Sequence, residues 1–361
     1  MYYNRELNVM EIKHTDERIN YYGRIDHKED GAYFYFPSTS AEVRFKGTEI
    51  SAVINANIVW GTTALGYVID GRMGQIPLST ENNGKDVWLQ LANSLEPDTE
   101  HTLVLYKRQA ASISFAFKSL SCDGEFLCAP EKPALKLEFY GDSVSAGEVT
   151  EAYDFVGRSD PASHGSAYDN SYLSYTWQTA RLLGAQLHNI AQGGIAVFDD
   201  TGYFHAPKMI GMESVYDKMC YFPEGGEITD WDFSRYTPDF VVFALGQNDN
   251  HNGITDADDI DIYDPETRKK WKEGYKAIAS DIYKKYGEKS KLIFLTTVLM
   301  HDPEWDKAID EIVNELNESG VTAYHKLFAR NGAATPGHPR YQEQKEMAEE
   351  LADFIKGLMN G

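Results

Sequence analysis

Cysteine is scarce in this chain of 361 residues. The three cysteines, Cys122, Cys128 and Cys220, form no CxxC motif and no paired Cys/His spacing. Such a set is typical of reduced thiols and excludes a zinc site built from clustered Cys and His ligands. We therefore expect neither a bound metal nor a cofactor.

Long apolar runs are also missing. No stretch approaches the roughly 18 consecutive apolar residues that indicate a membrane-spanning helix. Residues 1–20 show no basic stretch followed by an apolar one, which is the pattern of a secretion signal. The sequence therefore predicts a protein without a membrane partner, located in the cytoplasm.

Positive charge is in short supply. The 34 Lys and Arg residues face 56 Asp and Glu residues, which gives a formal net charge of −22. This charge repels nucleic-acid phosphates and anionic lipid surfaces, so nucleic acid is not an expected partner. A neutral substrate is compatible with it.

Short strands dominate the first third of the chain. Hydrophobic residues make up 42% of the sequence, enough for packed cores. Segments rich in β-branched and aromatic residues recur between Gly, Asn, Asp and Pro turns, at 32–36, 41–45, 49–59, 63–70, 101–107 and 112–117. This pattern predicts an antiparallel β-sandwich of the jelly-roll kind over residues 1–130.

Strands and helices alternate over residues 131–361, after the plausible linker APEKPA at 129–134. Expected strands lie at 135–140, 185–191, 239–246, 291–300 and 321–328, and expected helices at 171–184, 265–287, 305–320 and 339–361. Alternation of this kind predicts an α/β fold, a three-layer α/β/α domain with a parallel sheet. Ligands of such sheets bind at the carboxyl ends of the strands.

Four chemically suggestive residues follow expected strands or precede the last helix. They are Ser143 in FYGDSVSAG, Gly194 in HNIAQGGIAV, Asn248 in LGQND and His338 in TPGHPRY. A serine nucleophile needs a base within hydrogen-bond reach, and His338 is the candidate. The backbone N–H groups of Ser143 and Gly194 and the side-chain amide of Asn248 are candidate donors of an oxyanion hole.

This set resembles the SGNH (GDSL-like) hydrolase superfamily, whose four blocks are named for Ser, Gly, Asn and His. A β-sandwich ahead of an SGNH domain is similar to carbohydrate esterase family 2, with further likeness at 66–71, 103–108, 139–147 and 236–249. The resemblance implies a carbohydrate O-acetyl esterase acting on acetylated oligosaccharides or polysaccharides of plant origin, xylan or mannan and glucomannan. Without an export signal, we expect imported oligosaccharides as substrates.

The residue three positions before His338 departs from the superfamily pattern. An Asp is usual there, and this chain has Thr335. Either a main-chain carbonyl from residues 333–337 or a carboxylate from elsewhere must orient the imidazole. The resemblance to members of family 2 that use a Ser–His dyad favours the carbonyl. Asp142 is interpreted as a turn residue.

Substrate contacts are predicted from aromatic residues, because these stack on sugar rings. Trp305, Tyr203 and Phe204 follow expected strands and are the candidates, whereas Trp177 and Trp271 lie in helical patterns that indicate core packing. The acidic segment 249–264 is interpreted as a surface loop, with cation or substrate binding as the alternative.

Two rival functions remain at this point. One is a lipase-like or thioesterase SGNH hydrolase, which requires an apolar cleft. The other is a carbohydrate-binding protein with little turnover. These motifs do not determine the polysaccharide, the hydroxyl position or the oligomeric state.

Overall fold

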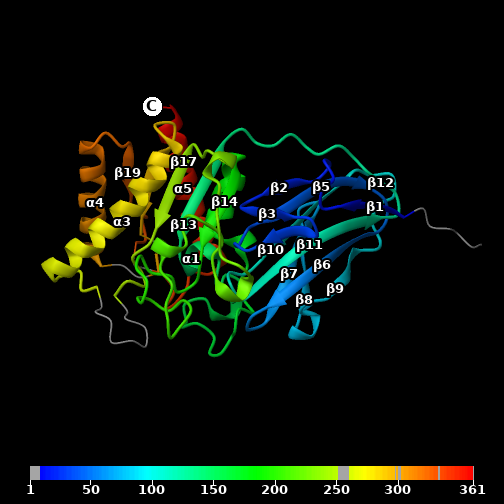
Figure 1. Cartoon of the computed structure of the whole chain (residues 1–361), viewed down its shortest axis with the longest axis horizontal. Helices are drawn as coiled ribbons and strands as arrows, with labels where there is room; N and C mark the ends of the chain where they lie inside the picture. The colour runs from blue at the N-terminus through cyan, green and yellow to red at the C-terminus, as the bar shows by residue number, and fades with distance from the viewer. Residues whose placement is uncertain (1–8, 251–259, 297, 300–301, 332–333, 361) are drawn as a thin grey trace, which may run out of the picture.

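The computed structural model describes residues 9–250, 260–296, 298–299, 302–331 and 334–360. Two antiparallel sheets build the amino-terminal part (Figure 1). The first contains β1 (Met10–Lys13), β3 (Ile25–Lys28), β4 (Gly31–Phe34), β6 (Ile50–Ile58), β9 (Asp86–Ala92) and β11 (Ile113–Cys122). The second contains β2 (Asn20–Tyr22), β5 (Ser40–Lys46), β7 (Thr63–Ile69), β8 (Arg72–Leu78), β10 (His101–Lys107) and β12 (Glu125–Phe126).

The alternating burial of side chains explains why the two sheets pack face to face. Along β6 and β10 every second side chain enters a shared apolar core, as Ile54 and Leu103 do, with almost no exposed surface. Asp70 and Gly71 connect β7 to β8 with φ angles of 50° and 77°. Positive φ at both central residues matches the tight hairpin turn whose twist suits antiparallel strands.

A parallel five-stranded sheet forms the centre of the described carboxyl-terminal part. Its order is β14-β13-β17-β18-β19, and every neighbouring pair is parallel. The strands are β13 (Lys136–Gly141), β14 (Gln186–Ala191), β17 (Phe240–Ala244), β18 (Lys291–Leu295) and β19 (Ala323–Lys326). A small hairpin pairs β15 (Lys218–Cys220) with β16 (Thr229–Asp230).

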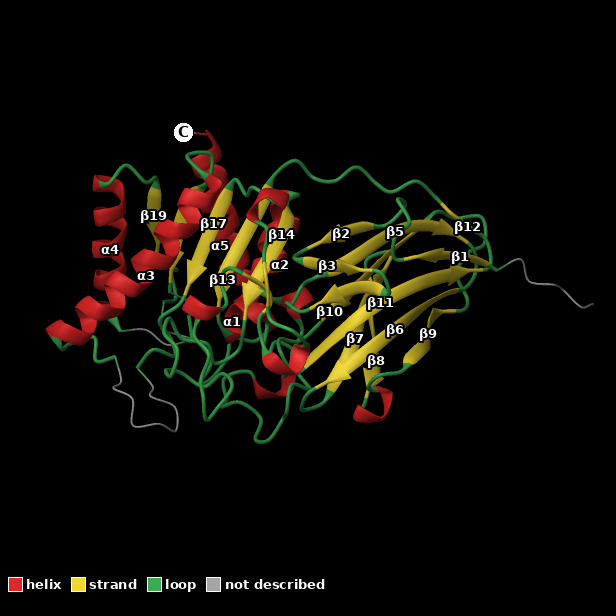
Figure 2. Ribbon diagram, viewed as in Figure 1, coloured by secondary structure: helices red, strands yellow, loops and turns green. Residues whose placement is uncertain are grey.

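Helices cover both faces of this sheet (Figure 2). They are α1 (Ser143–Ala146), α2 (Tyr175–Leu183), α3 (Pro265–Tyr286), α4 (Pro303–Glu318) and α5 (Tyr341–Asn360). Short 3-10 turns occur at Thr80–Asn82, Tyr153–Phe155, Ser171–Leu173, Met212–Ser214, Pro223–Gly225 and Phe233–Arg235. Residues of α3 and α4 share one core with one sheet face, and residues of α2 and α5 share another core with the opposite face. The predicted sandwich and three-layer α/β/α architecture is confirmed.

Several elements differ from the sequence-based expectation. The helix expected at 171–184 begins only at Tyr175, because Ser174 caps it after a 3-10 turn. Strands β8 and β9 were not predicted, nor were the short strands β1, β2, β3, β12, β15 and β16. β8 carries Gly74 and Pro77, which favour a loop, yet it is tolerated as an edge strand that pairs only with β7. Gly74 leaves room for the ring of Tyr67, which a Cβ at that position would meet at 2.2 Å.

Buried polar contacts join the two parts. Arg24 of the sandwich is fully buried, and its guanidinium lies 3.3 Å from the carboxylate of Glu138 and 2.8 Å from the hydroxyl of Tyr140. The amide of Ala111 donates to the side chain of Gln192, immediately after β14, at 2.9 Å. The sandwich loops are thereby held beside the carboxyl ends of β13 and β14. No helix in the described part of the chain is long and apolar enough to cross a membrane.

Candidate active site

Ser143 lies where β13 ends. Asp142 is the N-cap of α1, and its carboxylate accepts a hydrogen bond from the amide of Val144 at 3.0 Å. Gln247 donates to the same carboxylate at 2.5 Å, while burial raises the pKa of Asp142 to about 6. Asp142 is therefore the turn residue that the sequence indicated, and it presents Ser143 as the first residue of a one-turn helix.

His338 approaches Ser143 from the segment before α5. Its Nε2 atom lies 2.8 Å from Ser143 Oγ, although the two residues are 195 positions apart in the chain. The imidazole is about one-fifth exposed, with 22% of its side-chain surface accessible. This distance is that of a nucleophile and its general base.

Asp160 holds the other side of the imidazole. Its Oδ2 atom lies 2.6 Å from His338 Nδ1, and its Oδ1 atom accepts from the backbone N–H of His338 at 3.0 Å. The expectation that a main-chain carbonyl contacts Nδ1 is therefore wrong: the carboxylate comes from elsewhere in the chain, 178 positions away. Ser143, His338 and Asp160 form one hydrogen-bonded series.

The surroundings of Asp160 explain how a remote loop replaces the usual acid. Arg340, almost fully buried, donates to Asp160 Oδ1 at 2.8 Å and to the carbonyl of His338. Gly337 has a φ of 117°, and a Cβ there would lie 2.4 Å from Asp160 Oδ1. The segment before His338 therefore makes room for the carboxylate of Asp160, which belongs to the loop at 147–170, and the usual acid three residues before the histidine is not needed.

Electrostatics favours an ionised Asp160 and a more basic His338. Burial opposes ionisation of Asp160, but hydrogen bonds from His338 and Arg340 outweigh it and lower its pKa to about 2. Burial likewise opposes protonation of His338, yet the hydrogen bond to Asp160 and the negative field of Glu148 raise the pKa of His338 above its usual value. The pair is arranged to stabilise an imidazolium.

Thr335 stands where an acid is usual, but its side chain contacts the loop that carries Asp160 and not the imidazole. It is buried, and its hydroxyl accepts from the backbone N–H of Gly157, at the start of the segment that leads to Asp160. Thr335→Val removes this acceptor at nearly constant volume. We expect kcat/KM to fall about 5-fold, the kinetic equivalent of one hydrogen bond worth about 1 kcal/mol. Thr335→Ser should restore it, and equal rates for the two variants would exclude this role.

The candidate oxyanion donors lie in the same cavity as Ser143. Gly194 has a φ of 75°, and a Cβ there would crowd Tyr203 at 2.9 Å. The amide of Asn248 donates one hydrogen to the carbonyl of Ile195 at 2.9 Å, and an amide has a second hydrogen to offer.

Asp249, the residue after Asn248, accepts hydrogen bonds from Val197 N and Trp271 Nε1 at 2.8 and 3.0 Å. The strand end carrying Asn248 is thus anchored.

The cavity has a volume of about 880 Å³ and takes its walls from both parts of the molecule. Ser143, Gly194, Asn248, His338, Tyr203 and Phe204 all line it. Tyr203 is 54% exposed, whereas Phe204 is buried. The sandwich contributes Val59, Trp60 and Ala111, and Trp60 is 48% exposed. The structure therefore brings together every predicted site residue except Trp305.

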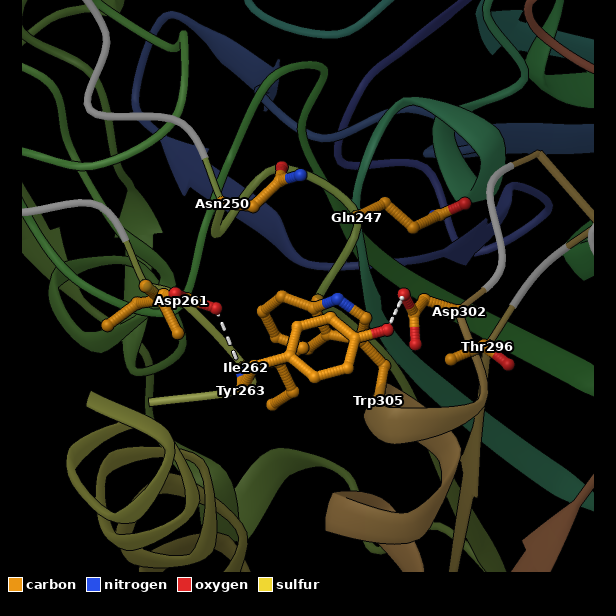
Figure 3. Close-up of a pocket in the computed structure, with 10 residues that line it drawn as sticks. Gln247, Asn250, Asp261, Ile262, Tyr263, Thr296, Asp302 and Trp305 are labelled. Atoms are coloured by element: carbon orange, nitrogen blue, oxygen red, sulfur yellow. Dashed lines mark hydrogen bonds between the residues drawn. The ribbon is translucent and has the colours of Figure 1, made fainter. Parts of the chain in front are cut away.

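Trp305 lines a separate pocket of about 550 Å³ (Figure 3). Its neighbours there include Gly246, Tyr263 and Asp302, and neither Ser143 nor His338 lines this pocket. Trp305 is buried and packs edge-to-face on Trp271 at a centroid distance of 4.8 Å. Its indole supports the packing of α3 against α4 and does not face the serine.

The acidic segment 249–264 falls only partly within the described residues, since 251–259 lie outside them. Of the described part, Asp249 is buried and so does not belong to a surface loop, and Asp264 caps the amino terminus of α3. No group of three or more His, Cys, Asp or Glu side chains in the described chain is arranged to hold a metal ion.

The unpredicted residues around the site include Asp160, Glu148 and Trp60. Asp160 lies in a loop without periodic pattern, and Trp60 lies in a sandwich turn far from the motifs in sequence. Glu148 follows the Ser143 motif directly and was the one residue with a local signal, a charged side chain among small residues.

Comparisons with known proteins bear on the family. Residues 21–130 match the family model described as "Carbohydrate esterase 2 N-terminal". Cellulase/esterase CelE of Acetivibrio thermocellus is 29% identical over 94% of this chain, which spans only 39% of that relative's length. An acetylxylan esterase / glucomannan deacetylase of Cellvibrio japonicus is 23% identical, with 99% of this chain and 94% of the relative aligned.

A solved structure agrees over nearly the full length. It is a family two carbohydrate esterase from Clostridium thermocellum in complex with cellohexaose, with 27% identity and a TM-score of 0.78. The match covers 95% of this chain and 99% of that one. The resemblance to carbohydrate esterase family 2, which the sequence indicates by a β-sandwich ahead of the SGNH motifs, is confirmed.

Proposed function

We propose that this protein is a carboxylic ester hydrolase that removes O-acetyl groups from carbohydrates through an acetyl-enzyme intermediate. The observation that carries the proposal is the hydrogen-bonded series from Ser143 Oγ through His338 to Asp160, at 2.8 and 2.6 Å. The series lies at the carboxyl end of β13, in a cavity large enough for a sugar unit.

In the first half-reaction, Ser143 Oγ attacks the acetyl carbonyl carbon while His338 Nε2 takes the hydroxyl proton. Negative charge develops on the carbonyl oxygen, near the donors of Ser143, Gly194 and Asn248. The imidazolium then gives its proton to the sugar oxygen as the ester bond breaks, leaving acetyl-Ser143. In the second half, water replaces the sugar alcohol, and acetate leaves.

Asp160 replaces the main-chain carbonyl in this mechanism. Its carboxylate fixes the imidazole so that the lone pair of Nε2 faces Ser143, and it stabilises the imidazolium while the intermediate exists. The Ser–His dyad expected from the sequence thereby becomes a Ser–His–Asp triad whose acid comes from the loop after α1.

The cavity walls support a carbohydrate substrate. Trp60 and Tyr203 are exposed at the wall, and their rings offer stacking surfaces for a sugar face. Polar side chains, Gln192, Asn248 and Glu224, share the lining and oppose a long acyl chain. The name of the Cellvibrio japonicus relative favours acetylated xylan or glucomannan, and oligosaccharides derived from them, as substrate class.

A panel of esters tests this function. The protein should hydrolyse p-nitrophenyl acetate faster than the butyrate or octanoate and should release acetate from acetylated xylo- and manno-oligosaccharides. Preference for long acyl chains would favour the lipase-like rival. Binding of oligosaccharide without acetate release would favour the carbohydrate-binding rival.

Asn248→Ala should lower kcat roughly 10²–10³-fold with little change in KM, because an oxyanion donor acts in the transition state and not on the bound ester. Steady-state kinetics on acetylated oligosaccharide measures both constants. A raised KM with unchanged kcat would make Asn248 a ground-state binding residue instead.

A further inference from the structure

Glu148 is a carboxyl group in the active-site cavity that the proposed mechanism does not use. It follows Gly147, which ends α1 with a φ of 82°, and its backbone N–H donates to the carbonyl of Ser143 at 3.0 Å. Val149, next in the chain, is fully buried with a φ of 57°, an unusual conformation for a β-branched residue. This turn places the Glu148 side chain in the wall of the cavity, with 20% of its surface accessible.

The Glu148 carboxyl lies close to the base His338 without a hydrogen bond between them. Glu148 Oε2 lies 3.9 Å from His338 Nε2, which is beyond hydrogen-bond length. Oε1 lies against Gly193, where a Cβ would come within 1.7 Å of it. Within the described residues, no side chain or backbone group donates a hydrogen bond to this carboxyl. Its oxygens are available to a substrate.

The charge state suits contact with a hydroxyl. Burial, together with the negative field of Asp169, raises the pKa of Glu148 to about 8, against the opposing effect of His338. A carboxyl in either protonation state accepts a hydrogen bond from a sugar hydroxyl, and the neutral form also donates one.

The distances define which substrate atom meets Glu148. The leaving oxygen must lie within hydrogen-bond reach of His338 Nε2 to receive its proton. Glu148 Oε2 lies 3.9 Å from that same nitrogen, so the carboxyl lies beside an oxygen held there and within reach of a group bonded next to it. On a sugar ring, this is the region of the hydroxyl next to the ester.

Resting on the proposed function, we propose that Glu148 binds a free hydroxyl adjacent to the acetylated oxygen and so determines specificity for sugar acetates that carry one. Sites built to hydrogen-bond a substrate hydroxyl reject the analogue that lacks it, because the buried polar group is then left unpaired. This arrangement also requires a glycine at position 193, because a side chain there would take the space that the Glu148 carboxyl occupies.

The test compares two substrates and four proteins. From the monoacetates of methyl xyloside, the isomer hydrolysed fastest is paired with its analogue in which the neighbouring hydroxyl is replaced by hydrogen. The native protein should prefer the hydroxylated substrate roughly 10–100-fold in kcat/KM, because the analogue leaves the Glu148 carboxyl unpaired in the cavity. Glu148→Ala should reduce the preference to below about threefold, and Glu148→Gln should retain part of it.

Glu318→Gln is the matched control, since Glu318 is an exposed carboxyl at the end of α4 that does not line the cavity. It should keep the native preference. If Glu148→Ala keeps it too, or slows both substrates equally, the inference is wrong and Glu148 acts through His338 alone. If the native protein hydrolyses p-nitrophenyl acetate but neither xyloside acetate, the proposed carbohydrate function fails, and the inference with it.

Discussion

Replacing Ser143 with alanine should lower the rate of acetyl ester hydrolysis on the order of 10⁶-fold, because members of a triad act as a unit and the nucleophile has no substitute. Ser143 Oγ makes its side-chain contact with His338 at 2.8 Å and lies at the cavity wall, so the fold should hardly change. Initial rates with p-nitrophenyl acetate and the thermal unfolding midpoint measure the two effects.

Ser145→Ala is the control with the opposite expected result, namely lower stability and retained activity. Ser145, two residues further along α1, is buried and hydrogen-bonds the hydroxyl of Tyr175 at 2.8 Å, away from the cavity. Its loss should cost about 1–3 kcal/mol of stability, because the Tyr175 hydroxyl is left without this partner. Activity should persist in the folded protein. A Ser143→Ala variant with more than a few per cent of native activity contradicts the mechanism.

Asp160→Asn should lower kcat about 10³–10⁴-fold, because the amide favours the wrong imidazole tautomer and no longer stabilises the imidazolium. The pH profile supplies a second readout. His338 must be neutral to act as base, and Asp160 raises its pKa. Removing the charge lowers that pKa, so the acidic limb of kcat/KM should move to lower pH.

Asp154→Asn is the control for this experiment, since Asp154 is an exposed carboxylate of the same loop. It should change neither the rate nor the pH profile. If Asp160→Asn retains activity within tenfold of the native protein and leaves the acidic limb in place, Asp160 is a structural partner of Arg340, and a dyad suffices for catalysis.

The fold was predictable where local pattern and tertiary structure agree. The buried apolar run of β17 and the helical spacing in α3 gave their elements correctly, because both patterns reflect burial directly. The edge strand β8 was missed because its glycine and proline are tolerated only where one side of the strand is unpaired.

The site residues that follow strands of the parallel sheet could be predicted, because the order of the strands brings them together. Ser143, Gly194 and Asn248 follow neighbouring parallel strands, so their meeting in one cavity follows from strand order. Asp160 could not be found in this way, because it reaches His338 through a long loop held by Arg340 and Thr335. Trp60 reaches the cavity through contacts between the two parts of the chain, which no local pattern encodes.

The acetyl-enzyme itself offers the most direct test of the central claim. The protein is mixed with acetylated xylo-oligosaccharide, quenched in acid within milliseconds, digested and analysed by mass spectrometry. The account predicts one added acetyl group on the peptide that contains Ser143, absent after longer incubation and absent from Ser143→Ala. Acetate release without acetylation of Ser143, or with the acetyl group on a different residue, would contradict it.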